Sequence, residues 1–66
     1  MKTNNYTIEA LNNGNVEMTR EIEATNINNA VDTAMMYAED YESIVIRAEN
    51  GQIAADINND GSYTIY

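Results

Sequence analysis

The fold follows from residues 6–22, which read YTIEALNNGNVEMTREI. At the centre of this stretch, Asn13-Gly14 is a dipeptide that accepts positive φ angles and suits a two-residue hairpin turn. Apolar and polar side chains alternate on both sides of the turn. Because alternate residues of a strand point to the same face, the alternation predicts an antiparallel hairpin with one apolar face. On that face we expect Tyr6, Ile8, Ala10, Val16, Met18 and Ile22.

Two further dipeptides, Asn50-Gly51 and Asp60-Gly61, predict hairpin turns later in the chain. The strands before and after Asn50-Gly51 show the same alternation, and residues 62–66 form a short last strand. The chain contains no proline that would interrupt these strands. The apolar face of the two strands around Asn50-Gly51 should contain Ile44, Ile46, Ala48, Ile53, Ala55 and Ile57.

Between the first hairpin and the later strands, apolar residues recur at the spacing of an α-helix. Thr25 or Asn26 can cap the start of this helix, because a short polar side chain accepts the free N–H groups of the first turn. One helix is therefore predicted, with a single apolar stripe made of Ile27, Ala30, Val31, Ala34, Met35, Ala38 and Tyr41.

These elements predict an α+β fold of hairpin, helix and meander in one small domain, residues 1–66. The expected order is ββαββ with a short fifth strand, and the helix covers one face of an antiparallel sheet. The strand order within the sheet stays open. In element order the chain resembles the immunoglobulin-binding domains of streptococcal protein G and peptostreptococcal protein L. The last strand is extra in that comparison and no motif is shared, so immunoglobulin binding is not expected.

The charge of the chain excludes several classes of function. Eleven acidic side chains stand against three basic ones, which gives a net charge of −8. Such a surface repels nucleic acid and anionic lipid, so its electrostatic partner should be a basic protein surface or a cation. The chain has no His or Cys and its only Lys is Lys2. We therefore expect no enzyme and no cofactor, because the common nucleophile–base pairs cannot form.

No stretch approaches the roughly 20 apolar residues of a membrane span, and the first residues lack the apolar run of a signal peptide. We expect a cytoplasmic protein that does not bind membranes.

The sheet face away from the helix is predicted to be acidic. Glu17, Thr19, Glu21 and Glu23 would form a row in which neighbours are about 6.6–6.8 Å apart, close to the spacing of successive phosphates. Such a row can be an ordinary solvated sheet face, or it can bind a basic partner. The candidate partner-binding residues on this face are Glu9, Glu17, Glu21, Glu23, Glu49 and Asp56, and a second patch contains Glu39, Asp40 and Glu42.

In size, acidity and lack of catalytic side chains, the whole chain resembles the small phage proteins that disarm bacterial defence, including anti-CRISPR proteins and DNA mimics. This resemblance implies a non-enzymatic inhibitor that occupies a basic nucleic-acid channel of a host defence complex, in the host cytoplasm. The acidic candidate residues would then substitute for phosphates. The alternative is a structural or adaptor module, β-grasp-like or homodimeric, which binds through a sheet edge or through an exposed patch of Met36 and Tyr37.

Residues 56–61, DINNDG, match the first half of a calcium-binding loop. The second half is absent, and the position of its bidentate Glu would fall one residue beyond Tyr66. A plain hairpin turn is the competing interpretation of this segment.

Overall fold

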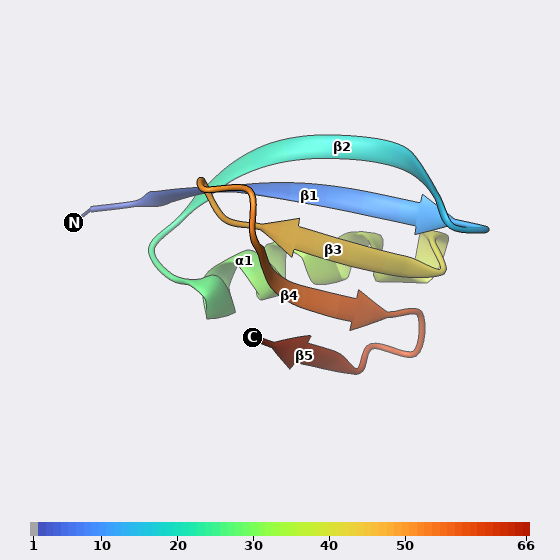
Figure 1. The fold of residues 1–66 in the computed structure, drawn as a ribbon. Coiled ribbons are helices and arrows are strands. Elements are labelled where there is room, and N and C mark those ends of the chain that lie inside the picture. The colour runs from blue at the N-terminus through green and yellow to red at the C-terminus, as the bar shows by residue number, and fades with distance from the viewer. Residues whose placement is uncertain (1) are drawn as a thin grey trace.

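The computed structural model describes residues 2–66 as one antiparallel sheet with a helical segment packed on one of its faces (Figure 1). The strand order is β2-β1-β3-β4-β5. The α+β prediction, ββαββ with a short fifth strand, is confirmed. The elements are β1 (Asn4–Asn12), β2 (Asn15–Ala24), the α-helix α1 (Ile27–Ala34), the 3-10 helix η1 (Met35–Asp40), β3 (Ser43–Arg47), β4 (Ile53–Asn58) and β5 (Tyr63–Ile65).

The first hairpin turns where the sequence predicts, but its alternation is broken by a bulge. Asn13 and Gly14 have φ angles of 53° and 79°, as a two-residue hairpin turn requires. The register shifts after Ala10, which is opposite Met18, so that Leu11 is opposite Val16. The prediction that Val16 lies on the apolar face is therefore wrong, because the extra residue in β2 moves Val16 to the other face beside Leu11.

A second bulge lies between β3 and β4. Ile46 is opposite Ala55, but Arg47 is opposite Ile53, which leaves Ala54 as the extra residue. Ile53 was also expected on the apolar face, and that prediction is wrong for the same reason. Its side chain lies beside Arg47 on the face away from the helix and is 45% exposed.

The predicted helix forms in two parts. Asn26 caps α1, and its side chain accepts a hydrogen bond of 3.0 Å from the backbone N–H of Asn29. The chain then tightens into η1, a change of helix type that the sequence does not predict. A 3-10 helix has three residues per turn, so Met35 and Ala38, three residues apart, both remain directed towards the sheet. Ala38 is buried and Met35 packs against the core.

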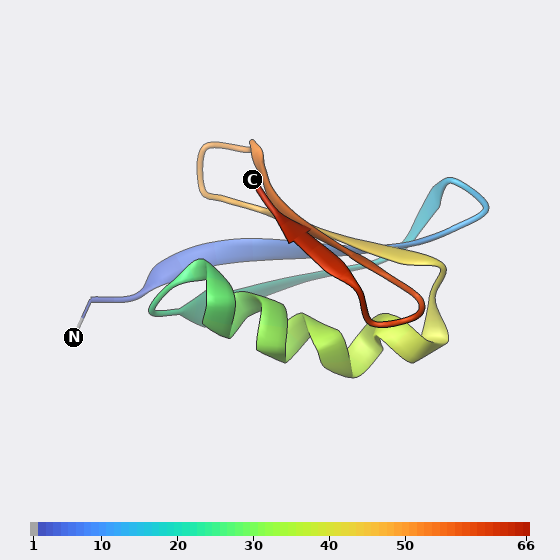
Figure 2. The same cartoon turned by 90° about the horizontal axis from the view of Figure 1, so that it is seen from below.

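The core lies between the helical segment and one face of the sheet, as Figure 2 shows from below. Its largest fully buried side chains come from three neighbouring strands and α1, and six alanines fill the remaining positions. A core so rich in alanine brings the helix close to the sheet and leaves little apolar volume. The buried residues are Tyr6, Ile8, Ala10, Ala24, Ala30, Val31, Ala34, Ala38, Ile44, Ile46, Ala55 and Ile57.

Candidate functional site

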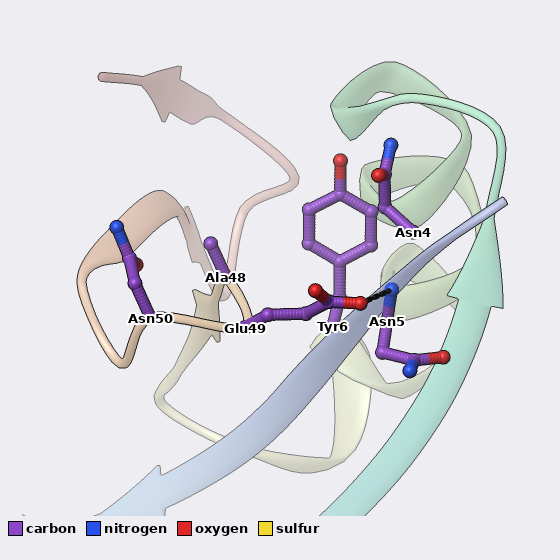
Figure 3. A pocket seen from close by; sticks show the side chains of 6 residues that line it. All are labelled: Asn4, Asn5, Tyr6, Ala48, Glu49 and Asn50. Atoms are coloured by element: carbon purple, nitrogen blue, oxygen red, sulfur yellow. Dashed lines mark hydrogen bonds between the residues drawn. The ribbon is translucent and has the colours of Figure 1, made fainter.

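One end of the acidic sheet face is concave, at the place where β1 and β3 are no longer paired. Their pairing begins at Thr7 and Arg47, so the start of β1 has no partner on this side within residues 2–66. The β3–β4 loop approaches it instead, and the Glu49 carboxylate accepts a hydrogen bond of 3.1 Å from the backbone N–H of Asn5 (Figure 3). A hollow of about 360 Å³ remains between the two segments, lined by Asn4, Asn5, Tyr6, Ala48, Glu49 and Asn50.

Two more carboxylates border the same end of the sheet. Glu23 is the cross-strand neighbour of Asn5, and Glu21 is the neighbour of Thr7. Glu21 and Glu23 share a small hollow with Asn5, and Glu21 lines another together with Glu49. Glu21, Glu23 and Glu49 therefore surround Asn5, and all three are exposed. We call these three residues the acidic notch.

The centre of the open face is less acidic than the sequence suggests. Glu9 forms an ion pair with Arg47, with 2.8 Å between Nε and Oε1. The Asp56 carboxylate accepts a hydrogen bond from the Tyr66 hydroxyl. Both carboxylates are half-buried, and each already has a partner within the chain. They are poorer contacts for a foreign cation than the acidic notch is.

Glu17 does not continue the predicted row along β2. It is the extra residue of the first bulge, and its carboxylate accepts a hydrogen bond of 3.3 Å from the Asn12 amide. The Asn12 side chain in turn accepts one from the backbone N–H of Glu42, at 2.9 Å. The row on the open face is therefore reduced to Thr19 and the two glutamates of the notch.

The hairpin tip carries its own acidic group. Glu42 binds the backbone N–H of Asn13 through its carboxylate, at 3.1 Å, which ties the end of the helical segment to the first turn. Glu39 and Asp40 are exposed at the end of η1. We call Glu17, Glu39, Asp40 and Glu42 the turn-end patch.

The two acidic groups act as separate electrostatic sites. Asn5 at the notch and Asn12 at the tip are seven residues apart on β1, which is about 24 Å at about 3.4 Å per residue. This separation exceeds the Debye length of about 8 Å at physiological ionic strength. The bulge at Glu17 and the loop position of Glu49 create this division, and the sequence pattern contains no signal for either.

The segment that resembles half a calcium loop is the turn between β4 and β5. Asp60 accepts hydrogen bonds from the hydroxyl and the backbone N–H of Ser62, and these bonds lower the pKa of the Asp60 carboxyl below its usual value. The Asp56 carboxylate accepts from the Tyr66 hydroxyl. Residues 2–66 contain no group of three carboxylates placed to share a metal ion. These contacts favour the hairpin-turn interpretation.

The predicted patch of Met36 and Tyr37 is divided. Met36 is 70% exposed. Tyr37 packs against the core, and the Arg20 guanidinium lies 5.7 Å from the centre of its ring. Tyr63, on β5, is 51% exposed.

The fold and its surface define a small acidic α+β protein of two layers, with one face of its sheet open. Comparison with known protein families, with curated proteins and with solved structures finds no match to this chain. Neither helix of the described residues is long and apolar enough to cross a membrane.

Proposed function

We propose that the protein is a non-enzymatic inhibitor or modulator that binds a basic protein surface through the acidic notch. The observation that carries the proposal is the gathering of Glu21, Glu23 and Glu49 around one concave end of the sheet. Arg47 lines the hollow that Glu21 and Glu49 share, but its guanidinium bonds to Glu9 and to the backbone oxygen of Gly51, and Arg20 lies over Tyr37. Three exposed carboxylates that share no metal are suited to several lysine or arginine side chains of a partner.

The partner proposed is a nucleic-acid-binding complex of host defence, and the protein acts in the cytoplasm of that host. Glu21 and Glu23 are two residues apart on β2, so their backbone positions are separated by about 6.8 Å, close to the spacing of successive phosphates. A groove that binds a nucleic-acid backbone offers cations at a similar spacing. The protein would inhibit the complex by excluding DNA from that groove, without a chemical step.

The test is a capture experiment from nuclease-treated bacterial lysate with elution by a salt gradient. We expect a DNA-binding complex that dissociates at moderate salt, because the contacts are exposed charges. Added duplex DNA should compete for it. A partner that resists salt and is not displaced by DNA would contradict the mimicry.

Two matched triple variants locate the contact. Glu21→Gln/Glu23→Gln/Glu49→Gln removes three charges from the acidic notch and keeps the oxygen that accepts from Asn5. The control, Glu39→Gln/Asp40→Asn/Glu42→Gln, removes three charges from the turn-end patch and keeps the oxygen that accepts from Asn13. Capture should fail for the first triple only. If the control fails instead, the turn-end patch is the binding surface and the notch proposal is wrong.

A further inference from the structure

The two edges of the sheet differ in a way that the proposed function does not use. β2 forms one edge and carries a bulge, Arg20 and the glutamates at positions 17, 21 and 23. Charges and bulges are the features by which proteins prevent edge-to-edge pairing. β5 forms the other edge, and residues 62–66 contain no charged side chain, no proline and no bulge.

The backbone hydrogen bonds show which groups of β5 face outwards. The N–H of Tyr66 donates to Ala54 at 3.0 Å, and the N–H of Asn58 donates to Ser62 at 2.7 Å. Bonded and non-bonded pairs alternate in an antiparallel ladder, so even-numbered residues of β5 bond to β4. The N–H and C=O groups of Tyr63 and Ile65 therefore point away from the sheet. Within residues 2–66 no strand pairs with them.

The side chains of the same two residues are incompletely covered. Tyr63 and Ile65 are opposite Ile57 and Ala55, both buried, so they lie on the face that the helix covers. However, α1 packs on β2, β3 and β4, and η1 packs on β3 and β4. Tyr63 is 51% exposed and Ile65 is 39% exposed. The edge thus combines free backbone groups with two apolar side chains beside them.

We propose that β5 pairs with β5 of a second copy of this chain across a two-fold axis. Thr64 is then opposite Thr64 of the second copy. Tyr63 of each copy is opposite Ile65 of the other. Each such pair exchanges two backbone hydrogen bonds, so the outward groups of both residues are satisfied in both copies. Tyr63 also packs beside Ile65 of the other copy, an aromatic pair with a β-branched residue.

Charge favours a second copy as the occupant of this edge. A basic partner is attracted to the acidic notch or the turn-end patch, and β5 itself offers it no acidic side chain. Two copies of a chain with a net charge of −8 repel each other almost everywhere except along this neutral strand. The acidic side chains beside this edge are Asp60, which accepts from Ser62 in the turn before β5, and Asp56, opposite Thr64. Across the dimer the two Asp56 residues are three strand spacings apart, about 14 Å, which exceeds the Debye length of about 8 Å.

The pairing would produce one sheet of twice the width. Side chains that are directly opposite each other in a ladder lie on the same face of the sheet. The helical segments of the two copies therefore lie on one side of the wide sheet, and the two open faces lie on the other side. The two acidic notches would then be displayed on the same surface, and a partner with repeated basic sites would contact both.

The experiment is analytical ultracentrifugation of the 66-residue chain from about 10 μM to about 1 mM, at low and at high salt. We expect a monomer–dimer equilibrium in which salt increases the dimer, because it screens the repulsion between the two copies. Salt should strengthen the dimer but weaken the binding of a basic partner. The dimer proposal and the proposed function can therefore fail independently. A monomer at every concentration and salt level overturns the inference.

Matched variants test the edge. Ile65→Lys should weaken the dimer by about tenfold or more. Ile65→Pro removes one outward N–H and keeps the bonds to β4, and it should weaken the dimer as well. The control, Val16→Lys, adds the same charge at an apolar residue of the opposite edge that is 49% exposed, and it should leave the dimer intact. Circular dichroism confirms that each variant folds. A dimer that survives both β5 variants, or that Val16→Lys disrupts equally, contradicts pairing through β5.

Discussion

Arg47 holds β3, β1 and the β3–β4 loop together on the open face. Its Nε donates to the Glu9 carboxylate at 2.8 Å, and Nη1 donates to the backbone oxygen of Gly51 at 2.9 Å. We expect Arg47→Gln to lower the free energy of unfolding by about 1 kcal/mol, because one half-exposed ion pair and one hydrogen bond are lost. Urea denaturation measures the change.

Glu9→Gln is the matched control for Arg47→Gln. It removes the ion pair and keeps the bond from Arg47 to Gly51, so its effect should be about 0.5 kcal/mol. The double variant should show a coupling of less than about 1 kcal/mol between the two residues. Equal effects of both single variants would show that the bond to Gly51 contributes nothing.

Asn59 joins the β4–β5 turn to the end of the helical segment. Its Nδ2 donates to the backbone oxygens of Ala38 and Tyr41, at 3.1 and 3.0 Å. Ala38 lies in the last turn of η1 and Tyr41 directly follows it, so their carbonyl groups need donors from outside the helix. Asn59→Ala should therefore lower the free energy of unfolding by about 1–2 kcal/mol, again measured in urea.

Asn28→Ala provides the comparison for Asn59. Asn28 is exposed on α1, and its side chain has no hydrogen bond within residues 2–66. Alanine is the better helix former, so this variant should be as stable as the wild type or slightly more stable. If Asn59→Ala behaves like Asn28→Ala, the turn does not stabilise the helix end.

The turns and the position of the helix could be predicted from the sequence because their causes are local. Asn13-Gly14 accepts the positive φ angles of a hairpin turn whatever surrounds it, and Asn26 caps the residues that directly follow it. The apolar residues of α1 likewise recur at the helical spacing before any tertiary contact is considered. These features depend on neighbours in the chain.

The bulges could not be predicted, because the alternation around them is undisturbed in the sequence. Glu17 stands between two apolar residues, Val16 and Met18, as in an ordinary strand, and Ile53, Ala55 and Ile57 recur at alternate positions of the other strand. Each bulge arises from the pairing of two strands, which is a property of the sheet. The composition of the candidate site depends on the first bulge, because Glu17 is its extra residue and bonds to Asn12 at the hairpin tip.

Ser62 controls the ionisation of Asp60. Its hydroxyl donates to the Asp60 carboxylate at 2.6 Å and its backbone N–H at 2.9 Å, and both bonds lower the pKa of that carboxyl. Ser62→Ala removes the larger cause, so the pKa of Asp60 should rise towards the usual value of 3.8 and remain slightly below it. Carboxyl-detected NMR titration measures the shift.

The same bonds predict how stability depends on pH. A carboxyl with a lowered pKa in the folded state stabilises the fold above its unfolded pKa, and this contribution is lost as pH falls through the folded value. The difference in stability between wild type and Ser62→Ala should therefore be constant at neutral pH and shrink only below about pH 3.8. A difference that instead changes near neutral pH would contradict the assignment to Asp60.

The contact between Tyr66 and Asp56 shifts the ionisation of the Tyr66 phenol. Its hydroxyl donates to the Asp56 carboxylate, and this bond, together with the negative charge of Asp56, raises the pKa of the phenol above its ordinary value of 10.0. Because the pKa of Tyr66 is raised in the folded state, its bond to Asp56 stabilises the fold at pH values below the ordinary phenol pKa. This stabilisation is lost as pH rises through the pKa of Tyr66 in the folded state. Ultraviolet titration should show that Tyr66→Phe removes a component whose pKa is raised above 10.0. Asp56→Asn keeps an oxygen acceptor but removes the charge, so it should lower the pKa of Tyr66 without eliminating that component. If Asp56→Asn leaves the titration unchanged, the Tyr66–Asp56 contact does not form in solution.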